Sequence, residues 1–339
     1  LDRRQPEFTQ TFTDYYTNRV TPARVQRGRE LLREHGGLLR DIQWETGVPA
    51  QYLVALWGLE TNFGSYFGNM QVPDALATLA CDRRRSNYFT RELMAALQIV
   101  DAGDVDAEEM LGSWAGAMGH VQFMPSVFLE HAVDADGDGR RDLWNSVEDV
   151  MTSAAEFLRA LGWEPGWRWG REVLLPEDFD YTLAGRDSRR PLSEWASMGV
   201  TDAFGQPLPA LDEPAGLLVP AGHQGPAFLV YSNFDVIMSW NRSEYYALSV
   251  GRLADEIAGS EPLQRPPPMD TLRVSRDSVR RLQQDLASLG FDAGDPDGVF
   301  GPATRNALSE FQRSRDLVAD GHLDHEAMTR VREAAEEQG

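Results

Sequence analysis

The sequence predicts a mainly α-helical protein with a small β subdomain and a separate small helical domain at its C-terminus. Apolar residues recur at helical spacing through most of the chain. A stretch rich in Gly, Pro and Trp interrupts this pattern between Gly162 and Gly225. A run of three prolines, Pro266 to Pro268, then precedes a final helical segment. The length of 339 residues suits about two domains.

The first elements are helices. Arg24 to Leu39 has helical spacing, with Gly36 and Gly37 as its expected stop. The next helix is expected to begin near Pro49 and to end at Gly64. One stripe of this second helix carries Leu53, Leu56, Trp57 and Glu60.

Further helices are expected over Tyr88 to Val100, Val150 to Leu161, and within Asn233 to Ile257. The segment between the last two contains the short apolar runs REVLLP, AGLLVP and AFLVYS. Runs of this length bounded by Gly and Pro favour small strands. We therefore expect a minor β lobe at about residues 162–225.

The three prolines divide the chain. They favour a stiff polyproline spacer, which can be neither a helix nor a central strand. This predicts a first domain of residues 1–260, a Pro-rich linker of residues 261–270 and a second domain of residues 271–339.

The composition excludes several classes of function. The formal net charge of −21 argues against nucleic-acid binding, which basic surfaces drive. The chain contains no lysine, so Schiff-base chemistry and a Walker A phosphate loop are excluded. A single cysteine, Cys81, rules out an internal disulfide and a Cys-rich zinc site. No apolar run reaches the roughly 18 residues of a membrane helix.

Two features could carry chemistry. Glu60 lies on an apolar helix face near the helix C-terminus, where burial and the helix dipole disfavour its ionised form. A carboxyl that stays protonated near neutral pH can act as a general acid. The segment from Gly112 to Phe128 combines small residues with Ser113 and Gln122, which suits close approach to a ligand. The alternatives are an ordinary surface glutamate and a packed glycine-rich turn.

Five segments now point to a family. They are GLETNFG, DALATLACDRRRSNYF, GSWAGAMGHVQFMPS, DADGDGRRDLW and NFDVIMSWNRSEYY, and they occur in this order. Together they resemble the family 3 lytic transglycosylases of the membrane-bound lytic transglycosylase B type, over roughly Phe8 to Ile257. The resemblance implies a goose-lysozyme-like α core with a small β lobe. It also implies cleavage of the β-1,4 bond between N-acetylmuramic acid and N-acetylglucosamine in peptidoglycan, leaving a 1,6-anhydromuramoyl end.

The resemblance assigns roles to individual residues. Glu60 matches the catalytic glutamate. The residues that match substrate-contacting positions are Phe63, Ser113, Met118, Gln122, Trp240, Asn241 and Tyr246. Trp240 stands where the family has a tyrosine, so sugar stacking could survive but a hydroxyl contact could not.

One carboxylate suffices for the implied chemistry. Ordinary glycosidases pair two carboxylates, whereas here the substrate's own 2-acetamido group can stabilise the developing cation. A hydrolytic muramidase and a non-catalytic wall-binding scaffold remain alternatives. Only the transglycosylase forms anhydro ends.

A third motif, DADGDGRRDLWNSVED, begins like an EF-hand loop. Asp134, Asp136 and Asp138 alternate before a glycine, as in calcium loops. The twelfth position holds asparagine, so the family's longer variant loop implies Glu148 as the bidentate ligand, with the backbone carbonyl of Arg140. We expect a structural Ca²⁺; Na⁺ or an ion-free Asp-Gly turn are the alternatives.

The tail contains two similar segments, DPDGVFGPATRNALSEFQ and VADGHLDHEAMTRV, each with Asp-Gly before a helix. They resemble a three-helix peptidoglycan-binding domain over Asp277 to Arg332. We therefore expect a monomeric enzyme of the Gram-negative periplasm whose signal peptide has been removed. Its partners would be glycan strands, with stem peptides as a further candidate, and no organic cofactor is expected.

Overall fold

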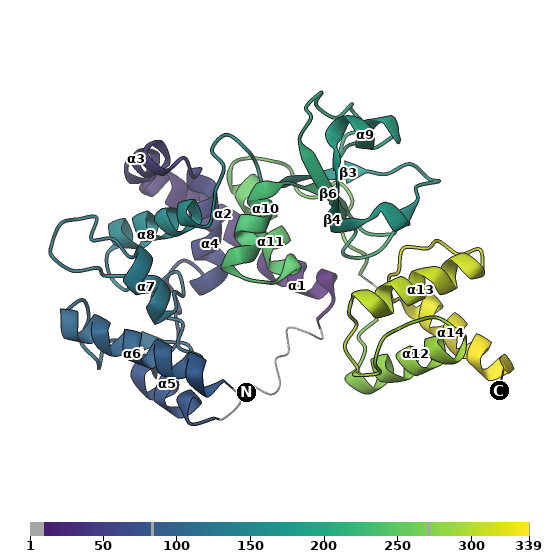
Figure 1. The fold of residues 1–339 in the computed structure, drawn as a ribbon. Helices are drawn as coiled ribbons and strands as arrows, with labels where there is room; N and C mark the ends of the chain where they lie inside the picture. Colours follow the sequence, from purple (N-terminus) through teal and green to yellow (C-terminus); the bar gives the residue numbers. More distant parts are fainter. Residues whose placement is uncertain (1–9, 83–84, 270–271, 339) are drawn as a thin grey trace. The chain divides into compact units, whose positions relative to one another are not determined.

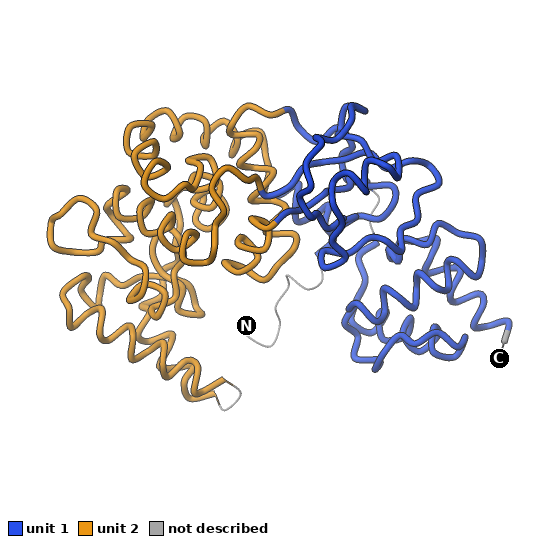
Figure 2. Tube along the Cα trace, turned by 45° about the horizontal axis from the view of Figure 1, so that its top comes forward, with its two compact units in different colours: residues 1–18, 169–231, 261–339 blue, residues 19–168, 232–260 orange. Residues whose placement is uncertain are grey.

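The computed structural model describes residues 10–82, 85–269 and 272–338. The chain divides into two compact units, each built from segments far apart in the sequence (Figure 2). The helical unit comprises residues 19–168 and 232–260, and the sheet unit comprises residues 1–18, 169–231 and 261–339. The end of the predicted linker and the start of the predicted second domain, residues 270 and 271, lie outside the described residues.

The helical unit is built from helices and one short two-stranded sheet (Figure 1). Its helices are α2 (Pro22–Glu34), α3 (Gly36–Thr46), α4 (Ala50–Thr61), α5 (Val72–Ala80), α6 (Ser86–Ala102), α7 (Pro125–His131), α8 (Val147–Ala160), α10 (Ser232–Trp240) and α11 (Glu244–Ile257). The sheet pairs β1 (Met70–Gln71) with β2 (Leu111–Gly112) in antiparallel register.

Helix α4 forms the centre of this unit. Its middle residues from Tyr52 to Gly58 are all buried, and Leu53 and Leu56 are fully inaccessible. The helix packs against α2, α3, α8 and α11. A helix that is apolar on every side is stable only when neighbours enclose it. The enclosure holds α4 in place and leaves its last turn, which carries Glu60, partly accessible.

One predicted boundary is wrong. The helix expected over Arg24 to Leu39 ends at Glu34, and Gly36 and Gly37 open α3 instead of terminating α2. His35 separates the two helices, and its N–H donates to the carbonyl of Leu31. Glycine costs about 1 kcal/mol relative to alanine in a helix interior, and tertiary packing can outweigh this preference.

The sheet unit contains a five-stranded antiparallel sheet in the order β4-β6-β7-β3-β5. Its strands are β3 (Gly170–Leu174), β4 (Gly185–Pro191), β5 (Thr201–Asp202), β6 (Pro214–Leu218) and β7 (Ala227–Val230). The same unit contains α9 (Leu192–Ser197), the 3₁₀ turn η2 (Tyr181–Leu183) and α1 (Phe12–Arg19). Only the last residue of α1, Arg19, belongs to the helical unit. The three predicted apolar runs form β3, β6 and β7, and Trp195 of α9 is fully buried against the sheet.

The last three helices are α12 (Arg276–Ser288), α13 (Pro302–Ser314) and α14 (His325–Gln338). They share a core that includes Leu286, Leu308, Phe311 and Val331. The predicted three-helix domain and the mainly α fold class are therefore confirmed.

The two Asp-Gly segments of the tail adopt the same local structure. Gln283 of α12 accepts a hydrogen bond from the N–H of Gly298 and donates to Asp297. Gln312 of α13 likewise accepts from the N–H of Gly321 and donates to Asp320. The repeat in the sequence thus corresponds to a repeated local structure: in both copies a helix glutamine forms hydrogen bonds with the Asp-Gly turn that follows its helix.

In the described part of the chain, none of the helices combines the length and the hydropathy that crossing a membrane requires.

Candidate active site

Glu60 is positioned by an unusual helix end. Helix α4 stops at Thr61, and the next three residues, Asn62, Phe63 and Gly64, have φ angles of 50°, 61° and 75°. Left-handed backbone is costly for residues other than glycine, so surrounding contacts must hold it. The N–H of Phe63 donates to the carbonyl of Trp57 at 3.1 Å, and the N–H of Gly64 donates to Thr61 Oγ1 at 3.0 Å. These bonds fix the helix end one residue after Glu60.

Phe63 itself folds back over α4. Its ring makes an edge-to-face contact with Trp57, with ring centroids 6.0 Å apart. Gly58 makes this possible, because a Cβ atom there would lie 2.8 Å from the Phe63 ring. Phe63 therefore packs against α4. The sugar contact expected for it from the sequence stays a prediction.

Two aromatic side chains bind the Glu60 carboxyl. The indole Nε1 of Trp240, the last residue of α10, donates to Glu60 Oε1 at 3.0 Å. The hydroxyl of Tyr246, in the first turn of α11, donates to the same oxygen at 2.5 Å. Hydrogen bonds donated to a carboxylate stabilise its ionised form. The structure thus brings together Glu60, Trp240 and Tyr246 from three helices.

The predicted glycine-rich segment forms a tight loop after β2. Ser113 Oγ accepts hydrogen bonds from the backbone N–H groups of Ala115 and Ala117. Gln122 adopts a φ of 53° and donates from Nε2 to the carbonyls of Phe67, at 3.1 Å, and Gly119, at 2.9 Å. Both polar side chains therefore have a structural task in the loop.

Two more predicted contact residues have contrasting exposure. Met118 is completely buried, so it belongs to the packed interior next to the loop. Asn241 is exposed, just after the end of α10. The substrate contacts predicted for these residues and for Ser113 and Gln122 stay predictions.

His120 joins this loop to α4. Its Nδ1 accepts a hydrogen bond from Trp57 Nε1 at 3.1 Å, and its carbonyl accepts one from Thr61 Oγ1 at 2.7 Å. Burial lowers the pKa of His120. Because an indole N–H only donates, the imidazole is neutral with its proton on Nε2. The sequence analysis did not predict this contact. Its only hint was the position of Trp57, one helical turn before Glu60 on the same stripe of α4.

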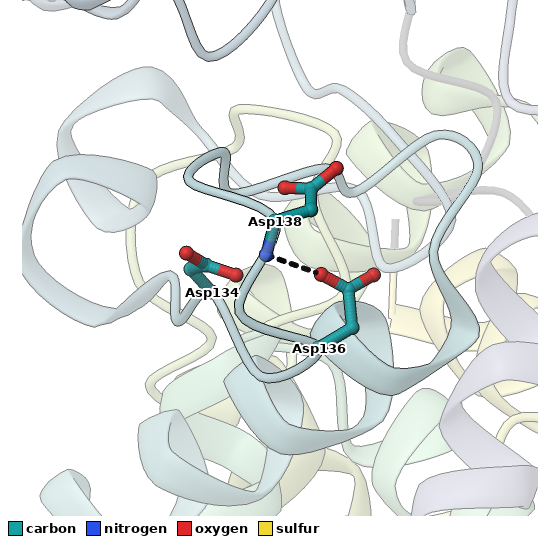
Figure 3. Close-up of side chains that lie close together, drawn as sticks. All are labelled: Asp134, Asp136 and Asp138. Carbon is teal, nitrogen blue, oxygen red and sulfur yellow. Dashed lines mark hydrogen bonds between the residues drawn. The ribbon is translucent and has the colours of Figure 1, made fainter.

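The predicted metal loop lies between α7 and α8. Oxygen atoms of Asp134, Asp136 and Asp138 all lie within 4.8 Å of one another (Figure 3). Asp134 accepts from the N–H groups of Gly137 and Gly139, which closes the turn around these carboxylates. Three converging hard oxygen donors fit Ca²⁺.

The far end of this loop is held by a carboxylate that the sequence analysis did not predict, and the role predicted for Glu148 stays a prediction. Glu148, the predicted bidentate ligand, is exposed in the first turn of α8, whereas its neighbour Asp149 is fully buried. Asp149 accepts hydrogen bonds from the N–H groups of Ala135 and Asp142, both at 2.7 Å. Burial raises the pKa of Asp149, and these N–H groups oppose the shift. Sequence analysis missed Asp149, which holds the two ends of the loop together.

Comparisons with known proteins place these features in a family. The family model of the transglycosylase SLT domain matches residues 1–255, and that of a peptidoglycan binding domain matches residues 275–330. Membrane-bound lytic murein transglycosylase B of Escherichia coli is 33% identical over 245 residues, which is 70% of this chain and 65% of that protein. The match thus spans slightly less than two thirds of that relative.

Solved structures agree. SltB3 from Pseudomonas aeruginosa, in complex with NAG-anhNAM-pentapeptide, superposes with a TM-score of 0.93 at 44% identity, covering 98% of this chain and 89% of that one. The Escherichia coli lytic transglycosylase Slt35, in complex with calcium, gives a TM-score of 0.65 at 31% identity, covering 76% of this chain and 80% of that one. The predicted resemblance is confirmed, and the chain belongs to the SLT-domain transglycosylase family.

Proposed function

We propose that this protein is a peptidoglycan lytic transglycosylase in which Glu60 is the single acid and base. The observation that carries the proposal is the Glu60 carboxyl at the end of a buried helix, held by Trp240 and Tyr246. Such fixed geometry suits a group that must give up a proton and later recover one. Family membership and the peptide-bearing glycan bound by SltB3 support the substrate class.

The reaction follows from one carboxyl group. Glu60 donates its proton to the glycosidic oxygen between N-acetylmuramic acid and N-acetylglucosamine, and that C–O bond breaks. The 2-acetamido group of the substrate stabilises the positive charge that develops at the anomeric carbon. The Glu60 carboxylate then takes the proton of the sugar's 6-hydroxyl, whose oxygen bonds to the anomeric carbon and closes the 1,6-anhydro ring. No water is consumed.

Product analysis tests the proposal. Purified sacculi are digested with the protein, and the masses of the released muropeptides are determined by mass spectrometry. Anhydromuramoyl products, each lighter by one water than a reducing end, are expected. Reducing ends alone would identify a hydrolytic muramidase, and no release of fragments would identify a wall-binding scaffold.

We infer a structural Ca²⁺ site in the α7–α8 loop. Asp134, Asp136 and Asp138 would supply carboxylate oxygens. The family's longer variant loop adds the carbonyl of Arg140 and the carboxylate of Glu148 as further proposed ligands. Calcium in the related Slt35 structure supports this choice of ion. The ion takes no part in the reaction and would fix the loop that precedes α8.

The proposed organisation is a catalytic domain of residues 1–260, a linker of residues 261–270 and a peptidoglycan-binding domain of residues 271–339. We propose that the protein acts in the periplasm of a Gram-negative bacterium, as a monomer on glycan strands with their stem peptides, and its similarity to the Escherichia coli and Pseudomonas aeruginosa enzymes supports this. Size-exclusion chromatography with light scattering tests the monomer, and pull-down with intact and peptide-free sacculi tests the partner.

A further inference from the structure

Trp240 is half-buried and packs among other aromatic side chains. Its ring lies 5.5 Å from that of Phe123 and 5.1 Å from that of Phe157, measured between centroids. Phe123 is buried within the Gly112–Phe128 segment, and Phe157 belongs to α8. Aromatic neighbours on this scale fix the orientation of a ring. What they orient is the indole N–H, which points to Glu60 Oε1 at 3.0 Å.

The chemical nature of this donor matters. An indole nitrogen donates a hydrogen bond and cannot accept one. Glu60 Oε1 therefore faces a group that can never receive a proton from it. The Tyr246 hydroxyl donates to the same oxygen at 2.5 Å, so Oε1 accepts two hydrogen bonds at once. A carboxyl oxygen that accepts two donors is a poor place for the acidic proton.

We propose that Trp240 is a positioning residue that, together with Tyr246, keeps Glu60 Oε1 as an acceptor and thereby places the transferable proton on Oε2. The proposal rests on the proposed function of Glu60 as the acid. It gives Trp240 a role different from the substrate contact expected from the sequence. Proton donation then starts from one defined oxygen, which is the geometric requirement of general acid catalysis.

Other ionisable groups lie near the end of α4 in the described part of the chain. Among them are Tyr246 on α11, His120 beside Trp57, and Arg24 on α2, whose guanidinium donates to Asn62 Oδ1 at 3.4 Å. Replacing Trp240 by phenylalanine removes one N–H and leaves these groups in place. A change in the titration of Glu60 in this variant therefore reports the lost hydrogen bond.

Kinetics provide the first test. In Trp240→Phe, kcat on a soluble glycan should fall about tenfold with KM little changed, because the lost group touches Glu60 and not the sugar. The alkaline limit of kcat/KM should move up by about one pH unit, because the ionised carboxyl loses a donor. Trp44→Phe is the matched control: it makes the same chemical change at an exposed tryptophan of α3, away from Glu60, and should leave that limit unmoved. A raised KM with an unmoved limit would instead identify a sugar-stacking residue and overturn the proposal.

Nuclear magnetic resonance provides a test that does not need activity. The full chain labelled with ¹⁵N-tryptophan has nine indole N–H groups, and the signal lost in Trp240→Phe identifies the one of interest. This signal should move with pH in the wild type and stop moving in Glu60→Gln. A signal that ignores pH in the wild type, or that still titrates in Glu60→Gln, would overturn the proposal. Its outcome is separate from that of the product analysis, which decides the reaction, and from the rate of Glu60→Gln on sacculi, which decides whether Glu60 catalyses.

Discussion

At the scale of single residues, the proposed mechanism depends on the carboxyl group of Glu60, which accepts hydrogen bonds from Trp240 and Tyr246. Glu60→Gln keeps the shape and an oxygen that can accept from Trp240 and Tyr246, but it cannot transfer a proton. We expect the fold to survive and the release of anhydromuropeptides from sacculi to fall about 10²- to 10⁴-fold. Retention of more than half of the wild-type rate would contradict the assignment of Glu60.

A matched control separates this effect from the loss of any glutamate near a helix end. Glu45 lies in the last turn of α3 and is exposed. Glu45→Gln makes the same chemical change outside the proposed site. It should leave both the rate and the melting temperature unchanged, because isolated surface substitutions have small effects.

At the scale of structural elements, the loop between α7 and α8 should depend on an ion. The three clustered carboxylates repel one another unless a cation lies among them. Ligand binding to the folded state stabilises it by about 2.7 kcal/mol at a hundredfold excess over Kd. A chelator should therefore lower the melting temperature of the protein, and added Ca²⁺ should restore it.

The double variant Asp136→Ala/Asp138→Ala provides the control for this prediction. It removes two of the three clustered carboxylates and keeps Asp149, which binds the loop backbone. Its melting temperature should be indifferent to chelator. A wild-type melt that does not respond to chelator, in protein shown to be metal-free, would contradict the site, and restoration by Na⁺ alone would contradict the choice of ion.

A second element-scale feature lies within the sheet unit. His223, in the loop between β6 and β7, contacts Asp320 in the second Asp-Gly turn of the C-terminal helices, with Nδ1 2.7 Å from Oδ2. The backbone N–H of His223 donates to the same oxygen at 2.8 Å. Asp320 is nearly fully buried in this contact. The contact therefore ties the sheet to the C-terminal helices through one titratable side chain.

The pH dependence of this contact has a definite sign. The hydrogen bond to Asp320 raises the pKa of His223 above its ordinary value of 6.5. Its contribution to stability is thus complete below about pH 6.5 and is lost as the pH rises through the raised pKa. We expect the free energy of unfolding of the sheet unit to fall between pH 6 and 8 by on the order of 1 kcal/mol or less, since His223 is partly exposed. His223→Gln should lose this dependence, and an unchanged slope in that variant would contradict the assignment to His223.

At the scale of the whole molecule, the C-terminal helices should act by tethering the enzyme to its substrate. A tethered binding domain raises the local concentration of the enzyme without altering its active site. Deleting residues 272–339 should therefore leave kcat on a short soluble glycan nearly unchanged and slow the digestion of insoluble sacculi at limiting enzyme. A melting curve of the truncated protein checks that the remainder still folds.

The contrary result is equally specific. If the C-terminal helices built part of the substrate site, the truncated protein would lose activity on soluble glycan as well. An equal loss on the two substrates would refute tethering.

The sequence by itself determined what depends on neighbouring residues. The stripe through Trp57 and Glu60 predicted helix α4, which carries the proposed acid, because helical periodicity repeats within a few residues. The alternating Asp134, Asp136 and Asp138 predicted their own cluster, because a short turn brings them together. The Asp-Gly repeats of the tail predicted two equivalent turns for the same reason.

Only the tertiary structure decided which residues meet across the chain. Trp240 and Tyr246 follow Glu60 by 180 and 186 positions, and His223 precedes Asp320 by 97, so no local pattern links these pairs. Asp149 was overlooked beside Glu148 because sequence spacing does not show which of two adjacent carboxylates faces inward. Contacts of this kind arise when helices pack and bury their shared faces, a cooperative property of the whole core.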